Sequence, residues 1–532
     1  MSIDTVIVPD TSSMAVILAL RDSGTVCTVL TVANQPQVKT NGHTTPDPPT
    51  ELTSEREASK TFAQVSDALA TTSIKVLKLE DLPQSDNDEL ATRIALPRPH
   101  DTAHILFTMD HTGRIKGAVS THAHLMTAAA TVHSQFPIGQ RLGQSDRYLN
   151  AAQFADPMGL NICHAVTLIG GSIIVDNYKT VEAISNDAYA SRPTLLYLPA
   201  TLFNSLYLAL LDHIDRYATM ERIFCHRSLG RKMALLESGR LTYSTFWDLL
   251  YFRHFRISLG GSVKAMFTQG ATAIQGAAKF VRATMSCQVL LTYGMLETSG
   301  LMTSTLFYDY TEPYGAHVGP PLPCCEIKLV NNASTRCRVT DEPNPRGEIH
   351  VRGNNVLKTV HIDEAGSAAV EVPTASTNGW LATGVMGQLL PNGTLQLLGD
   401  ASTYIELPTV ERYVSLPRCE NILRASRLVN QICLVYSEDV AELVAVVYPH
   451  MFGLLHWAKG TRTNYALASI ASNRPVIEAI LEDLATVGAE HGLEGPEIPK
   501  KVVLVSHPFN VENKMLKPDL SMDRMVIKAK CT

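Results

Sequence analysis

The sequence predicts an α/β protein whose large N-terminal portion is followed by a small α+β C-terminal portion. From residue 105 onward, short apolar strands alternate with amphipathic helices, which is typical of layered α/β architecture with mainly parallel sheets. From about residue 347 the strands shorten and the turns become close, which favours an antiparallel, barrel-like β module. The chain has 532 residues. It therefore exceeds the roughly 250–300 residues at which a single hydrophobic core stops growing.

These changes of texture divide the chain into three predicted segments. Residues 1–104 form a shortened N-terminal α/β segment, residues 105–399 the large domain and residues 400–532 the small C-terminal domain. Within the two larger segments the pattern predicts helices over residues 201–213, 271–285 and 475–491, and a strand over residues 443–448.

The N-terminal segment predicts a small α/β unit. Residues 5–8 and 26–32 are short β-branched runs on either side of a predicted helix over residues 12–22. Residues 35–60 are rich in Pro, Thr and Glu and poor in apolar side chains, so they predict a mobile surface loop.

Composition excludes several classes of protein. The 45 Lys and Arg residues against 51 Asp and Glu residues give a formal charge of −6 without a dense basic run, which argues against nucleic-acid binding. The most apolar stretch, residues 165–175, is shorter than the roughly 20 residues of a spanning helix. It predicts a buried strand-turn-strand, and no transmembrane helix is expected. The 10 scattered cysteines predict a reducing, intracellular compartment and leave cytosol and mitochondrion both open.

Several motifs occur in a fixed order along the chain. They are residues 105–125 (ILFTMDHTGRIKGAVSTHAHL), 258–271, 287–298 (CQVLLTYGMLET), 317–330, 347–353, 379–384 (GWLATG), 391–400 and 509–524 (FNVENKMLKPDLSMDR). Together they resemble the long-chain acyl-CoA synthetases of the adenylate-forming, AMP-binding superfamily. The match in this order is specific, although each motif alone is weak.

The resemblance implies an acyl-CoA synthetase-like fold, with a distorted β-barrel in the large α/β portion and a small, mobile C-terminal domain. Such enzymes activate a fatty acid with Mg-ATP to acyl-AMP and then transfer the acyl group to CoA. The hinge of the C-terminal domain falls on Asp400. The nucleotide positions that carry over are Thr108, Thr112, Gly113, Lys116, Gly117, Tyr293, Gly294 and Glu297, the last at the magnesium position.

The phosphate loop departs from the family pattern. Such a loop needs small residues, because backbone N–H groups and hydroxyls must approach the phosphates closely. Met109, Asp110 and His111 stand where the family has small or hydroxyl residues. Asp110 also adds a negative charge, and two like charges about 4 Å apart repel by about 4 kcal/mol at an effective dielectric near 20. We therefore expect the loop not to hold ATP in the family's way.

Three further positions lack the family's polar group. Val385 occupies the position of the family's ribose-binding carboxylate in the motif T-G-D, and its side chain accepts no hydrogen bond. Ala401 occupies the position of the family's arginine after the hinge. The catalytic lysine position is Ser521. Loss of one preorganised electrostatic group commonly costs about 10²–10³ in rate. Lys517 lies four residues earlier, up to about 13 Å of extended chain away, and does not reach the same point.

We interpret the chain as a catalytically inactive acyl-CoA synthetase-like protein, a pseudoenzyme that serves as a structural or scaffolding subunit. No cofactor is expected in that case, and the retained Tyr293, Gly294 and Glu297 then fill core, turn and cap positions. Thr108 lies closer to the start of the sequence than the phosphate loop of these synthetases usually does. We therefore expect an exposed apolar surface on the large domain that other protein subunits cover. Two alternatives stay open. One is an ATP-dependent fatty acid–CoA ligase with rearranged groups, using Mg-ATP and CoA, and the other is a module that binds fatty acid or acyl-CoA.

Overall fold

The computed structural model describes residues 3–8, 26–31, 75–78, 97–109, 115–152, 156–175, 180–243, 245–246, 248–271, 273–274, 276–310, 317–362, 369–372, 378–407, 412–437, 442–461, 474–490, 492–510, 512–516 and 522–531. The chain divides into two compact units. The first comprises Met1–His122 with Leu357–Thr374, and the second comprises Ala123–Val356 with Ala375–Thr532. The predicted boundaries at residues 104 and 399 stay predictions.

The first unit contains two sheets. One is parallel, in the order β1 (Ile3–Val8), β2 (Val26–Thr31) and β3 (Lys75–Lys78), which confirms the two strands predicted near the N-terminus. The predicted helix over residues 12–22 and the predicted loop over residues 35–60 lie outside the described residues. The other sheet is antiparallel, in the order β15 (Ala369–Val372), β14 (Lys358–Ile362), β5 (Ile115–Thr121) and β4 (Thr102–Met109).

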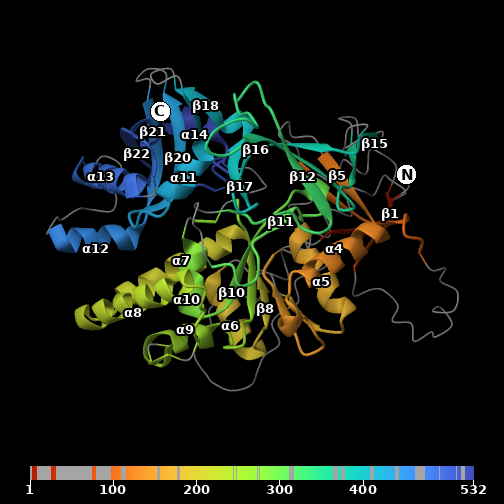
Figure 1. Cartoon of the computed structure of the whole chain (residues 1–532), viewed down its shortest axis with the longest axis horizontal. Helices are drawn as coiled ribbons and strands as arrows, with labels where there is room; N and C mark the ends of the chain where they lie inside the picture. The colour runs from red at the N-terminus through yellow and green to blue at the C-terminus, as the bar shows by residue number, and fades with distance from the viewer. Residues whose placement is uncertain are drawn as a thin grey trace. The chain divides into compact units, whose positions relative to one another are not determined.

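The second unit is built around a six-stranded sheet, in the order β11-β10-β9-β8-β6-β7 (Figure 1). Its strands are β6 (Arg147–Asn150), β7 (Ser172–Val175), β8 (Leu195–Tyr197), β9 (Ala265–Gln269), β10 (Gln288–Tyr293) and β11 (Thr303–Ser304). All pairings are parallel except that of β11 with β10. The alternation with helices confirms the predicted α/β class. The helices are α4 (His122–Ser134), α5 (Pro157–Leu168), α6 (Val181–Ser191), α7 (Ala200–Asp215), α8 (Thr219–Glu237), α9 (Arg253–Ser258) and α10 (Ala277–Met285), with the short 3-10 helices η3 (Ile138–Gln140) and η5 (Leu296–Thr298) and the short π-helix η4 (Asp248–Phe252).

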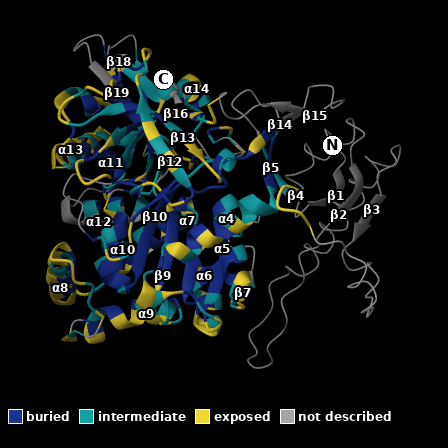
Figure 2. Ribbon diagram, turned by 45° about the vertical axis from the view of Figure 1, so that its right-hand side comes forward, coloured by how far each residue is buried: buried dark blue, intermediate teal, exposed yellow. Residues whose placement is uncertain are grey.

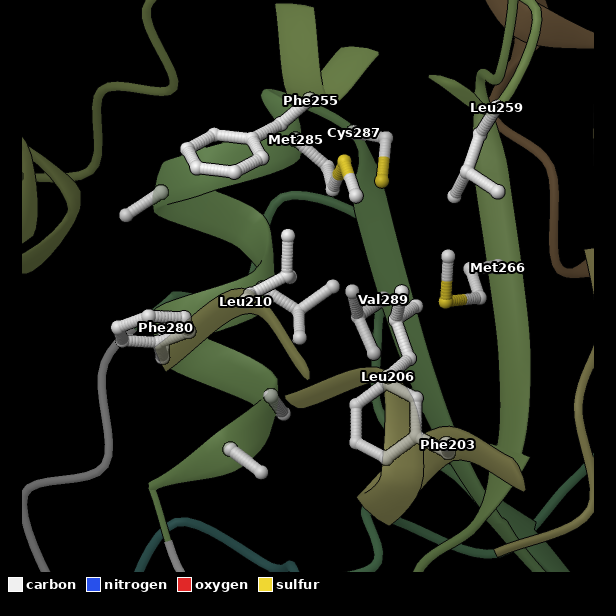
Figure 3. Close-up of a cluster of buried hydrophobic side chains, with 14 of the residues drawn as sticks. Phe203, Leu206, Leu210, Phe255, Leu259, Met266, Phe280, Met285, Cys287 and Val289 are labelled. Carbon is white, nitrogen blue, oxygen red and sulfur yellow. The ribbon is translucent and has the colours of Figure 1, made fainter. Parts of the chain in front are cut away.

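Helix α7 confirms the predicted helix over residues 201–213 and shows why the sequence forms it. Phe203, Leu206 and Leu210 recur at helical spacing and are buried, so they place one apolar stripe against the sheet. In Figure 3 these side chains meet Val289 from β10 and Phe280 from α10. Burial of each such side chain contributes about 1.5–3 kcal/mol, so this cluster fixes the helical layer on the sheet.

The predicted antiparallel module is confirmed as a second sheet of this unit. It runs in the order β12 (Cys325–Val330), β13 (Arg346–Gly353), β16 (Leu381–Leu389) and β17 (Leu395–Asp400), with all neighbours antiparallel. Alternate residues of β13 are buried, as the pleat requires for a sheet that covers a core on one face.

The C-terminal elements have a core of their own. They are η6 (Ala401–Thr403), β18 (Tyr404–Leu407), β19 (Arg412–Ser415), α11 (Leu416–Leu423), β20 (Val429–Ser437), β21 (Glu442–Pro449), α12 (Met451–Thr461), α13 (Arg474–Glu490), η8 (Gly495–Glu497), β22 (Lys501–Leu504) and α14 (Arg524–Cys531). β21 and α13 confirm the strand predicted over residues 443–448 and the helix predicted over residues 475–491. Arg524 of α14 donates from both terminal nitrogens to the buried carboxylate of Glu420 in α11, at 2.5 and 2.8 Å.

Two predicted elements are wrong or shifted. The apolar run over residues 165–175 is the end of α5, a turn and β7, and not a strand-turn-strand. The reason lies upstream of the run, where the Asp156 carboxylate accepts from two backbone N–H groups and Pro157 opens the helix. Helix α10 begins at Ala277 rather than at residue 271, because Gly276 adopts φ +78° immediately before it.

Candidate functional site

Tyr293, Gly294 and Glu297 lie at the carboxyl edge of the parallel strands of the second unit. β10 ends at Tyr293, β9 at Gln269 and β8 at Tyr197. In open α/β sheets, ligands bind beyond this edge, where the connecting loops converge. The sheet therefore supports the region that the sequence motifs single out.

The segment after Tyr293 is a tightly packed turn. A Cβ placed on Gly294 would lie 2.1 Å from the carbonyl carbon of Gly300, so only glycine fits there. The Met295 N–H donates to the Thr298 hydroxyl at 2.9 Å, and this bond holds η5, which carries Glu297. Packing alone thus accounts for a glycine at position 294, in agreement with the interpretation of Gly294 as a turn residue.

Two asparagine side chains brace this turn from outside. The Asn161 amide, on α5, donates to the Ser299 carbonyl at 2.5 Å. The Asn355 amide donates to the carbonyls of Leu301 and, at 3.4 Å, Thr298. Since both amides are buried, the turn is fixed in one conformation.

The Tyr293 side chain is buried, and its hydroxyl makes no hydrogen bond in the described part of the chain. Burial raises the pKa of Tyr293, and the nearby carboxylates of Asp400 and Glu297 raise it further, against a smaller opposing effect of the Thr383 side chain, which lies near the hydroxyl without completing a hydrogen bond of good geometry. An unpaired buried hydroxyl costs about 1–3 kcal/mol. This atom is therefore a natural contact for a polar group that the protein itself does not supply.

The ribose position is apolar. Val385 lies on β16, where it pairs with Asp400 of β17, and its side chain packs against the hydrophobic cluster that contains Tyr293. The adjoining Glu348 carboxylate is already engaged, because Oε1 accepts from the Gly384 N–H at 3.1 Å and Oε2 accepts from the Asn332 amide at 3.1 Å. Glu348 therefore does not replace the missing ribose carboxylate.

The hinge position and its neighbour lie at a strand end. Asp400 closes β17, is exposed, and is followed directly by η6. Ala401 packs against a small apolar cluster of Cys337, Met386 and Leu398. A methyl group in this place supplies no cation to a phosphate or a ribose.

The phosphate-loop positions lie in the first unit, between two antiparallel strands. Met109 of β4 pairs with Ile115 of β5, and Thr108 pairs with Lys116. Lys116 and Gly117 also face β14 across the sheet. The positions between the strands, Asp110, His111, Thr112 and Gly113, lie outside the described residues, as does Ser521.

A polar cluster at the same sheet edge is not marked by any motif of the sequence. The Tyr197 hydroxyl donates to Asp156 Oδ2 at 3.0 Å, and the Gln269 amide lies 3.4 Å from that oxygen. Burial raises the pKa of Asp156 against the opposing effect of its hydrogen bonds, and raises the pKa of Tyr197. The signal available in the sequence was the helix start at Asp156-Pro157. The other two partners are 41 and 113 residues away.

The residues of this edge fit Mg-ATP only in part. The unpaired Tyr293 hydroxyl and the braced turn that carries Glu297 would suit a nucleotide base and a magnesium ion. The apolar packing of Val385 and Ala401 does not suit the ribose and phosphates. Among the described side chains, no group of three or more His, Cys, Asp or Glu is arranged to hold a metal ion.

The AMP-binding enzyme family matches residues 3–361, which is more than half of the chain, so this protein belongs to that family. It is 32% identical over 437 residues to the peroxisomal long chain acyl-CoA synthetase 6 of Arabidopsis thaliana, covering 80% of this chain and 59% of that protein. It is 29% identical to human long-chain-fatty-acid–CoA ligase 1, again over 80% and 59% of the two chains. The chain thus spans about three fifths of the length of these relatives.

Solved structures agree on the fold. The adenylation domain of carboxylic acid reductase from Segniliparus rugosus superposes with a TM-score of 0.65 at 20% identity, covering 95% of this chain and 70% of that one. A benzoate CoA ligase from Burkholderia xenovorans LB400 gives a TM-score of 0.62 at 15% identity, covering 99% and 89%. The predicted acyl-CoA synthetase-like fold is therefore confirmed. Within the described residues, no helix is long and apolar enough to cross a membrane.

Proposed function

We propose that this AMP-binding, acyl-CoA ligase-like protein no longer carries out adenylation and serves as a non-catalytic subunit of a larger assembly. The observation that carries the proposal is the apolar packing of Val385 against the cluster that contains Tyr293. Where related enzymes need a carboxylate for two ribose hydroxyls, this chain has two methyl groups in a hydrophobic setting.

The size of this change supports a loss of nucleotide affinity. Each hydroxyl left without its partner costs about 1–3 kcal/mol, so two cost about 2–6 kcal/mol. That range corresponds to roughly 30-fold to 10⁴-fold in the dissociation constant. The sequence adds Ala401 and Ser521 at the two cationic positions, and Met109 with Asp110 in the phosphate loop. Penalties at separate sites add approximately, so no single compensating change restores the function.

Two other functions remain as alternatives. The braced turn that carries Glu297, with the unpaired Tyr293 hydroxyl, favours an ATP-dependent fatty acid–CoA ligase with rearranged groups. Mg-ATP and CoA would then be its cofactors. The similarity to ligases is consistent with such cofactors and does not favour their absence. The second alternative is a module that binds fatty acid or acyl-CoA without chemistry.

Calorimetric titration with AMP and with Mg-ATP tests the proposal. We expect the unmodified chain to bind neither at micromolar concentrations, and Val385→Asp to tighten AMP binding at least about tenfold by restoring the hydroxyl acceptor. Leu389→Asp, at an exposed position of the same strand, is the matched control and should change nothing. Micromolar binding of AMP by the unmodified chain would contradict the proposal.

The subunit role has a separate test. The tagged chain should purify from its native cells with a fixed set of other proteins, and that set should survive Lys116→Ala and Glu297→Ala. A role that disappears in these variants while the fold persists would favour the catalytic alternative.

A further inference from the structure

Large hydrophobic side chains are exposed in one region of the second unit, around α8, η4 and α9. We call this region the α8–α9 apolar surface, and it consists of Met220, Ile223, Phe224, Tyr243, Phe246, Leu249, Leu250 and Ile257. Among the described residues, eight of the eighteen exposed large hydrophobic side chains lie here, within 38 residues of sequence. Leu249 and Phe246 are 64% and 68% exposed. The surfaces of α8 and α9 are visible as exposed segments in Figure 2.

A buried polar network anchors η4, which carries two of these side chains. Lys232 of α8 pairs with Asp248 at the start of η4, and both are almost fully buried. The Thr245 N–H and hydroxyl donate to the same carboxylate at 3.0 and 2.6 Å. This pair anchors the short π-helix η4 on α8, and the next two residues of η4, Leu249 and Leu250, are exposed to solvent.

The two halves of the surface lie beside each other. The ring of Tyr251, next to Leu250, is 6.4 Å from the ring of Tyr217, which lies two residues before α8. The Tyr217 hydroxyl is 3.1 Å from His254 Nε2 on α9. The N-terminal turns of α8, with Met220 and Ile223, therefore share one region with η4 and α9.

The exposed charges around this surface are mainly positive. Four arginines of this region are exposed: Arg227, Arg231, Arg240 and Arg253. Two acidic side chains are exposed here, Glu221 and Glu237, and Glu237 is already paired with Lys279. A local positive excess on a chain whose net charge is −6 complements an anionic surface.

We propose that the α8–α9 apolar surface docks on the headgroup region of an anionic phospholipid bilayer. Exposed aromatic and leucine side chains beside arginines suit a membrane interface, where apolar groups enter the boundary region and cations stay among the headgroups. The apolar side chains enter the boundary between headgroups and acyl chains, and the arginines contact the lipid phosphates. This docking requires no catalysis and is independent of the function proposed above.

Vesicle co-sedimentation of the full chain measures this docking. We expect binding to vesicles that contain phosphatidylserine, weaker binding to phosphatidylcholine alone, and release as the salt concentration rises. Leu249→Glu with Leu250→Glu should lower the partition coefficient by at least about tenfold, because both side chains leave the interface. Arg227→Glu with Arg253→Glu should remove the preference for phosphatidylserine, since each arginine contributes roughly fivefold.

Ile138→Glu is the control, because this side chain is 84% exposed on η3 and lies outside the surface. It should leave vesicle binding unchanged, and thermal unfolding should show that all variants fold. Equal binding by the leucine variant and the unmodified chain would overturn the proposal. The absence of binding to both vesicle types would also overturn it. If the unmodified chain then associates with itself or with a protein partner, and the leucine variant does not, the surface is a protein-contact surface.

Discussion

The ion pair beneath the α8–α9 apolar surface offers a sharp test of how this region is held. Lys232 and Asp248 are 2% and 1% exposed, and Lys232 also donates to the Ser286 hydroxyl at 2.9 Å. Replacing Lys232 by methionine keeps most of the apolar stem and removes the cation. Asp248 then remains buried with only hydroxyl and backbone donors.

The expected cost follows from this burial. Breaking a buried ion pair by removing one partner costs about 3–5 kcal/mol, because the other charge stays uncompensated. Hydrogen exchange of peptides from α8 and η4 reports this local free energy, whereas global unfolding of a multidomain chain does not follow a two-state law. Protection in Lys232→Met should fall by roughly 10²-fold to 4 × 10³-fold.

The controls separate burial from charge. Lys279→Met, on α10, removes a partly exposed cation that pairs with the exposed carboxylate of Glu237 on α8, and it should leave the protection unchanged. Lys232→Met combined with Asp248→Leu should lose less protection than the single variant, since no buried charge is left. A single variant with unchanged protection, or strictly additive effects, would refute this account of the ion pair.

The same network predicts an acid response. Burial raises the pKa of Asp248, but hydrogen bonds from Lys232 and Thr245 outweigh it, and the pKa is lowered overall. Burial also lowers the pKa of Lys232, which by itself disfavours the charged pair, but the direct contact of its Nζ with the carboxylate and the two Thr245 donors favour the ionised pair. A lowered folded-state pKa means that this stability is present above the unfolded value of about 3.9 and is lost as the pH falls below it. Protection of η4 should therefore decline on acidification in the unmodified chain, and the decline should be weaker in Asp248→Leu.

Three further outcomes are expected. Gly294→Ala should reduce the melting temperature or prevent folding, because the added Cβ would lie 2.1 Å from the Gly300 carbonyl carbon. Arg524→Lys should cost about 1.5–3 kcal/mol in the local stability of α14, measured by hydrogen exchange, since one ammonium does not reproduce the two bonds to buried Glu420. Partial desolvation and the neighbouring His213 lower the pKa of the otherwise exposed His254, so a small part of the stability present above pH 6.5 should decline on acidification below it, and His254→Phe should reduce this decline in thermal scans.

Much of the fold was predictable because local pattern and tertiary packing agree. Phe203, Leu206 and Leu210 follow one helical stripe, and the same stripe is buried on the sheet. The failure at residues 165–175 has a physical cause: an apolar run shows burial, but the choice between helix and strand was made upstream by the Asp156 cap. Periodicity inside the run did not contain that information.

Some residues of the candidate site were predictable from the sequence, and others were not. Gly294 was recognisable from its motif, and its close contact with Gly300 accounts for it. The cluster of Asp156, Tyr197 and Gln269 joins residues far apart in the sequence, so nothing local marks it. The apolar surroundings of Val385 likewise come from several strands and become visible only in the folded chain.

The most direct test of the central claim is product formation. The purified full chain is incubated with Mg-ATP, CoA and fatty acids from short to long chain, and acyl-AMP and acyl-CoA are measured by mass spectrometry beside human long-chain-fatty-acid–CoA ligase 1 as the positive control. We expect no product above a sample without protein. ATP-dependent acyl-AMP or acyl-CoA that disappears in Glu297→Gln would contradict it and establish a working ligase.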